Sequence, residues 1–78
     1  MALYKNANFL KHSTHANFDK TYSPGDPAPD PGIYKCIVCG DEIGIAKGHT
    51  LPPQNHHQHR PGLGSIKWQL IVCSVSAS

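Results

Sequence analysis

The chain of 78 residues has few of the features that stabilise a small domain without help. Hydrophobic residues make up 38% of it, and its aromatic side chains are limited to one Trp, three Tyr and two Phe. A core of that size leaves a domain of this length only marginally stable. A structural zinc contributes roughly 10 kcal/mol or more to folding in small fingers. The composition therefore favours a small metal-stabilised domain.

Long apolar runs and clustered charges are also missing. The longest apolar cluster, residues 70–73, has the length of a strand and falls far below the roughly 18 residues of a membrane span. The first eleven residues lack the apolar stretch of a signal peptide. The seven Lys and Arg give a net charge of +2 without a run of four, so the sequence has no local footprint for nucleic acid. We expect a soluble, cytoplasmic protein.

The three cysteines are too few, and odd in number, for a disulfide framework. Cys36 and Cys39 form a close pair, which fits a metal site in a reducing compartment better than a disulfide. Cys73 is interpreted as a small residue at the end of a strand.

Proline and glycine divide the chain. Residues 23–32 contain four prolines in ten positions, which forbids a helix and discourages a central strand. We expect this segment to be extended, polyproline-like and hydrogen-bonded mainly to water. The resulting organisation is an N-terminal arm and Pro-rich linker over 1–31, a metal-binding domain over 32–73 and a flexible tail over 74–78.

Alternating residues predict three antiparallel strands in the second part. Residues 33–36 and 42–47 form a hairpin with Cys36 and Cys39 at its tip, where Gly40 takes a positive φ angle. Residues 65–72 form the best strand, with one apolar face that includes the expected core residue Trp68. The members of that face are Ile66, Trp68, Leu70 and Val72.

Two pairs of metal-ligand residues share the same spacing. Cys36-x2-Cys39 supplies two thiolates, and His56-x2-His59 supplies two imidazoles. Zinc favours four nitrogen or sulfur ligands in a tetrahedron, so these four residues are the predicted ligands of one zinc ion. A redox Cys pair would need a helix after its first cysteine, whereas glycines and β-branched residues follow Cys36 here.

The histidine assignment leaves alternatives open. His57 with His59 is a second choice, and His49 is a further candidate for the fourth ligand or for a hydrogen bond to a ligand. Two Cys and two His would close the site, and a closed zinc site is normally structural. If only one histidine binds, a Cys2His site keeps a position for water, with His57, His49 or Glu42 as a proton shuttle.

These motifs resemble those of the zinc-ribbon proteins, whose first Cys-x2-Cys-Gly turn follows an aromatic strand. The resemblance rests on Tyr34-x-Cys36-x2-Cys39-Gly40, Leu51-Pro52-Pro53, His56-x2-His59 and Trp68. Residues 32–72 also look like small bacterial proteins of uncharacterised function with a Leu-Pro-Pro-Gln-Asn-His-His-Gln-His core. The resemblance implies a three-stranded antiparallel ribbon held by zinc, although zinc ribbons usually carry a second Cys pair where this chain has histidines.

Two other resemblances are weaker. Asn55-His56-His57 is similar to a motif of His-Asn-His nucleases, but the helix that follows it in that family is missing here. Rubredoxin-like proteins bind iron with four thiolates, and two histidines shift the preference toward zinc. The favoured function is a binding module for protein or nucleic acid, and the alternative is a small metal-dependent enzyme or metal-handling protein.

The fold would separate these functions. A nucleic-acid module should expose Tyr34 or Trp68 for stacking and gather its cations on one face. Those cations are Lys35, Lys47, Arg60 and Lys67. A protein-binding module should bury the aromatic residues and expose an apolar patch or a sheet edge. An enzyme should hold its metal in a pocket with an open coordination position.

Overall fold

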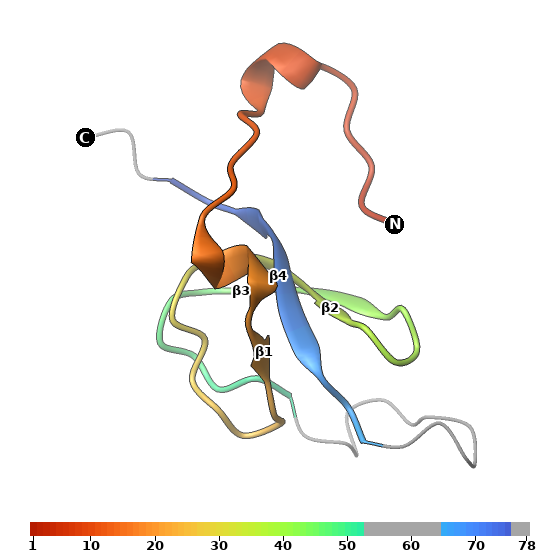
Figure 1. Cartoon of the computed structure of the whole chain (residues 1–78), viewed down its shortest axis with the longest axis vertical. Coiled ribbons are helices and arrows are strands. Elements are labelled where there is room, and N and C mark those ends of the chain that lie inside the picture. The colour runs from red at the N-terminus through yellow and green to blue at the C-terminus, as the bar shows by residue number, and fades with distance from the viewer. Residues whose placement is uncertain (53–64, 76–78) are drawn as a thin grey trace.

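The computed structural model describes residues 1–52 and 65–75. Its strands form one antiparallel sheet in the order β1-β4-β2-β3 (Figure 1). The strands are β1 (Thr21–Tyr22), β2 (Gly32–Cys36), β3 (Glu42–Ile45) and β4 (Trp68–Cys73), and two 3₁₀ turns precede them, η1 (Ala7–Phe9) and η2 (Ala16–Asp19). The expected small antiparallel β fold is confirmed. The expected number of three strands is wrong, because the N-terminal segment supplies β1.

The predicted hairpin is present as β2 and β3. Lys35 lies opposite Glu42 at the turn end, and Gly32 lies opposite Ile45 at the other end. Gly40 has the predicted positive φ angle, +86°. This conformation closes the turn that carries both cysteines, since glycine adopts it without steric cost.

A β-bulge changes which residues of β4 face the core. Leu70 lies opposite Tyr34, but the next pair joins Val72 to Ile33, so Ile71 is the extra residue. An extra residue reverses the in–out alternation beyond it. Cys73 therefore packs against the core in the place that the sequence pattern predicted for Val72. The predicted apolar face is right for its other three members and wrong for Val72.

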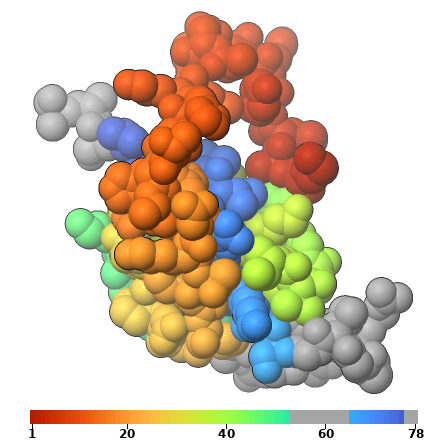
Figure 2. Space-filling view, viewed as in Figure 1, coloured from red at the N-terminus to blue at the C-terminus, as the bar shows by residue number. Residues whose placement is uncertain are grey.

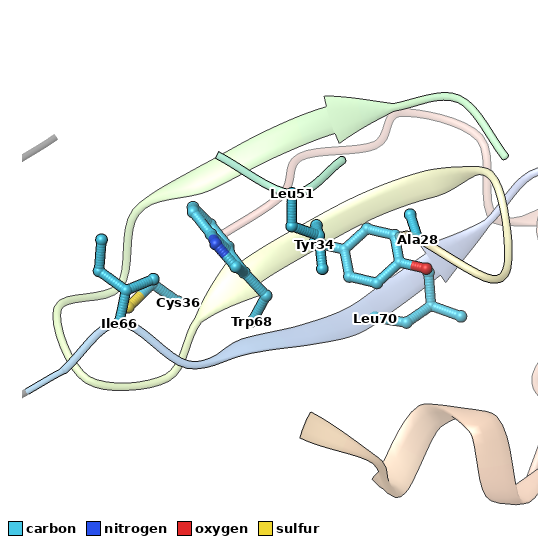
Figure 3. Close-up of a cluster of buried hydrophobic side chains, with 7 residues drawn as sticks. All are labelled: Ala28, Tyr34, Cys36, Leu51, Ile66, Trp68 and Leu70. Atoms are coloured by element: carbon cyan, nitrogen blue, oxygen red, sulfur yellow. The ribbon is translucent and has the colours of Figure 1, made fainter. Parts of the chain in front are cut away.

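The core lies on one face of the sheet, between the strands and the segments that cross them (Figure 3). Trp68 is fully buried, as predicted, and its Nε1 donates to the Pro52 carbonyl oxygen at 3.3 Å. The Tyr34 hydroxyl donates to the Asp30 carbonyl oxygen at 2.7 Å. In the described part of the chain the buried residues are Ala28, Tyr34, Cys36, Leu51, Ile66, Trp68 and Leu70.

The Pro-rich linker is part of this core, contrary to the expectation that it bonds mainly to water. Ala28 is fully buried; its N–H donates to the His49 carbonyl oxygen at 2.9 Å, and its own carbonyl accepts from Gly48 at 2.8 Å. Prolines 27, 29 and 31 occupy alternate positions. In an extended chain alternate N–H groups point to the same side, so these prolines leave the donor of Ala28 intact on the other side.

The N-terminal arm divides into two parts. Residues 1–15 stand out from the body of the molecule (Figure 2), and Leu3 and Phe9 are 97% and 79% exposed. The η2 turn is fastened to the sheet, because Gln69 Nε2 donates to the Phe18 carbonyl oxygen at 2.6 Å. Within the described ranges no helix is long and apolar enough to cross a membrane.

Candidate metal centre

The turn from Cys36 to Gly40, the knuckle, presents two sulfurs at the tip of the β2–β3 hairpin. Cys36 is buried at the end of β2, and Cys39 is exposed. Gly40 N–H donates to the Cys36 carbonyl oxygen at 2.7 Å, and Cys36 N–H donates to the Asp41 carbonyl oxygen at 2.7 Å. These two bonds fix the turn, and both thiols are free of disulfides.

The main chain around the knuckle favours a thiolate at Cys36. Burial opposes ionisation, but backbone N–H groups of Cys39, Lys67 and Val38 and the Cys39 thiol hydrogen-bond to the sulfur, and together they lower the pKa of Cys36 to about 6 from an ordinary 9.0. The pKa of Cys39 is raised by burial and by its hydrogen bond to Cys36. The two shifts together favour the thiolate at Cys36 rather than at Cys39. Thiolate is the form that binds zinc.

The approach to β4 lies directly against the knuckle. Ile37 N–H donates to the Lys67 carbonyl oxygen at 2.9 Å, and the Lys67 N–H points to the Cys36 sulfur. Sequence reasoning missed Lys67 here, because a backbone donor leaves no signal in the residue type. Lys67 therefore contacts the knuckle through both of its main-chain groups.

Pro52 lies at the same end of the sheet as the knuckle. Trp68, which bonds to Pro52, lies opposite Cys36 in the register of β2 and β4. Pro52 and Lys67, described residues on either side of positions 53–64, thus both lie at the knuckle end of the sheet.

Cys36 and Cys39 are brought together as predicted, whereas His56, His57 and His59 lie outside the described residues. His49 is exposed and belongs to the turn that pairs with Ala28. Within residues 1–52 and 65–75, no group of three or more His, Cys, Asp or Glu side chains gathers closely enough to hold a metal. His49 thus does not complete a site with the two cysteines in this part of the chain.

Glu42 and Cys73, the remaining candidates, make their contacts with other parts of the molecule. The Glu42 carboxylate pairs with the Met1 amino group at 2.9 Å. Cys73 lies opposite Gly32, at the far end of β2 from the knuckle. It lines a groove of about 1230 Å³ between the arm and β4, and neither knuckle cysteine lines that groove.

Comparison with known proteins gives one extensive match. The chain is 47% identical over 76 residues to Protein L of Escherichia coli, and the alignment covers 92% of this chain and 86% of that protein. The chain belongs to the Protein L family. An uncharacterized protein of Mycobacterium tuberculosis is 50% identical over 34 residues, which cover 44% of this chain and 34% of that protein. No protein-family model and no solved structure matches the chain.

Proposed function

We propose that this Protein L family member is a cytoplasmic zinc-binding module whose Cys36, Cys39, His56 and His59 hold one structural zinc ion. The observation that carries the proposal is the knuckle itself, in which several main-chain donors converge on the Cys36 sulfur. Such donors stabilise a metal-bound thiolate and set its orientation. Cysteines that form no disulfide fit a reducing compartment.

A closed, structural site agrees with the size of the core. Among residues 1–52 and 65–75 the fully buried side chains are few, and three of them (Cys36, Ile66 and Trp68) belong to the knuckle end of the sheet. A zinc ion at the knuckle would join the hairpin to the segment between Pro52 and Ser65. It would thereby close a long connection whose ordering otherwise costs conformational entropy.

The burial of the aromatic residues favours a protein partner over nucleic acid. Tyr34 and Trp68 are both fully buried, so neither offers a face on which a base could stack. The surface instead exposes apolar side chains of the arm, including Leu3 and Phe9, and the β3 edge. These are features of a protein-binding module. We therefore place protein interaction ahead of nucleic-acid binding in this proposal.

Zinc affinity of matched variants tests the ligand set. Cys39→Ser should lower the affinity by at least about 100-fold, since a thiolate ligand is lost, while Cys73→Ser should bind zinc like the wild type. A competition titration against a chromophoric chelator measures both. Equal affinities for Cys39→Ser and the wild type would refute the site.

A second pair of variants separates the closed site from a Cys2His site open to water. His59→Ala and His56→Ala should each weaken zinc binding strongly, and His57→Ala should leave it nearly intact. A loss with His57→Ala, or with only one of the three, would change the ligand assignment and favour the metal-dependent enzyme or metal-handling alternative.

A further inference from the structure

The β3 strand is an edge of the sheet. The strand order β1-β4-β2-β3 places it outside β2 (Figure 3), and among residues 1–52 and 65–75 no other strand pairs with its outer side. An edge strand of this kind offers unpaired main-chain donors and acceptors to another chain. The main-chain N–H and C=O groups of β3 that face outward determine what kind of strand can pair with it.

The hydrogen bonds of β2 show which main-chain groups of β3 face outward. Cys36 N–H donates to the main-chain carbonyl oxygen of Asp41 on the β3 side, and Ile37 N–H donates to that of Lys67 on the β4 side. Main-chain groups alternate along a strand, so Tyr34 and Gly32 also bond toward β3. Their partners Ile43 and Ile45 then point inward. The N–H and C=O groups of Glu42 and Gly44 consequently point outward.

The sequence around β3 is self-complementary. Two copies pairing antiparallel about a two-fold axis at Gly44 would place Gly44 opposite Gly44 and Ile43 opposite Ile45. The same register sets the acidic end of one strand, at Asp41, against the basic end of the other, at Lys47. Opposite charges and apolar side chains facing each other across strands are each stabilising. Because the arrangement is symmetric, each contact occurs twice.

Gly44 leaves the edge sterically open. It is exposed, and a Cβ atom added there would have open space within 4 Å. A side chain added there would therefore project from the sheet face into open space and would not obstruct a second strand that pairs in the plane of the sheet. In the described part of the chain, the Glu42 carboxylate of β3 forms an ion pair with the Met1 amino group. This ion pair involves the Glu42 side chain and does not use the main-chain groups of Gly44.

We propose that the β3 edge is a homodimer interface, in which two copies of this chain join through β3 in the Gly44-centred register and form one continuous eight-stranded sheet. The interface depends on main-chain groups of Glu42 and Gly44 and on the charge pairing of Asp41 with Lys47. It is independent of the groove beside the arm. It also goes beyond the proposed zinc site, which lies at the hairpin tip.

Sedimentation velocity of the zinc-loaded full chain over a concentration series tests the interface. The wild type should form dimers, more weakly at high salt because Asp41 and Lys47 are screened. Gly44→Pro should be monomeric, since it removes the central outward donor and an edge strand tolerates proline at such a position. Gly44→Val is the matched control: it adds a strand-forming side chain in open space and should still dimerise.

Two further variants keep the result decisive if Gly44→Pro fails to fold. Lys47→Glu should shift the dimerisation constant toward monomer by about 3- to 10-fold, as expected for two cross-strand charge pairs. In a Cys73→Ser background, Gly44→Cys should form an intermolecular disulfide on mild oxidation, because directly opposed residues lie close enough.

A wild type that stays monomeric up to its solubility limit, or dimers unaffected by both Lys47→Glu and Gly44→Pro, would overturn the proposal. Zinc content measured on the same samples keeps this outcome separate from a failure of the metal site.

Discussion

At the residue scale, Gly32 joins the linker to the sheet at a point where no other residue fits. Its φ angle is +151°, and an added Cβ atom would overlap the carbonyl oxygen of Val72. The β-bulge of β4 adjoins this contact, because Gly32 lies opposite Cys73, just beyond Ile71. Gly32 therefore lets the end of β4 approach the start of β2 closely.

Gly32→Ala should destabilise the protein by about 2 kcal/mol or more, because it combines an overlap with backbone with an unfavourable φ angle. Gly44→Ala is the matched control, since its Cβ atom meets open space, and it should change the stability by less than about 1 kcal/mol. Urea unfolding followed by Trp68 fluorescence measures both. Similar midpoints for the two variants would contradict this account of Gly32.

The lowered pKa of Cys36 makes the stability of the folded chain dependent on pH. The folded value of about 6 lies below the ordinary 9.0, so the contribution of the thiolate is complete above pH 9 and is lost as the pH falls through about 6. In the zinc-loaded chain the same thiolate is a proposed ligand, so protons also compete with zinc as the pH falls, and the urea midpoint should decrease from pH 9 to pH 6. Cys73→Ser, which leaves the knuckle intact, should show the same slope, and a midpoint that rises on acidification would contradict the prediction.

The cysteine pair is the part of the site that residue spacing predicts best. Two intervening residues and a following glycine favour a tight turn between two strands, so the tip of the hairpin could be predicted from local sequence. The contact with Lys67 depends on how β4 pairs with β2, and pairing over a separation of about thirty residues leaves no local signal. The predicted histidine ligands lie outside the described residues, and their role stays a prediction.

At the element scale, the hairpin and β4 follow from local patterns, whereas β1 does not. Thr21–Tyr22 has only two residues, too few for an alternating pattern to stand out. Long-range packing determines the position of β1. Tyr22 lies opposite Trp68, and the Tyr22 ring packs edge-on against the Tyr34 ring with 6.2 Å between the ring centroids. The bulge at Ile71 was equally invisible, since it arises from pairing and not from residue type.

This division of the arm predicts different effects for two truncations. Removing residues 1–14 should change the free energy of unfolding by less than about 1 kcal/mol, because side chains such as Leu3 and Phe9 are exposed. Removing residues 1–22 should cost about 2–3 kcal/mol, since the buried area of Tyr22 and Phe18 is lost. Urea unfolding compares the two; equal stabilities would show that β1 contributes nothing.

At the scale of the whole molecule, the core is concentrated on one face of the sheet. The linker and the segment through Leu51 cover that face. Leu51 N–H donates to the main-chain carbonyl oxygen of Asp26 at 2.9 Å, and Gly25 N–H donates to that of Leu51 at 3.0 Å. This cover is irregular chain with few apolar side chains, so it supplies less hydrophobic stabilisation than a helix would. A zinc ion at the knuckle is the additional constraint that our account assigns to the fold.

The central claim is that one zinc ion holds this chain in its folded form. Native mass spectrometry with elemental analysis, performed on the purified chain before and after chelation and paired with far-ultraviolet circular dichroism, tests it most directly. We predict one tightly bound zinc per chain and loss of the folded signal when the metal is removed. A chain that is folded without stoichiometric metal, or that retains its fold and unfolding midpoint after chelation, would contradict the claim.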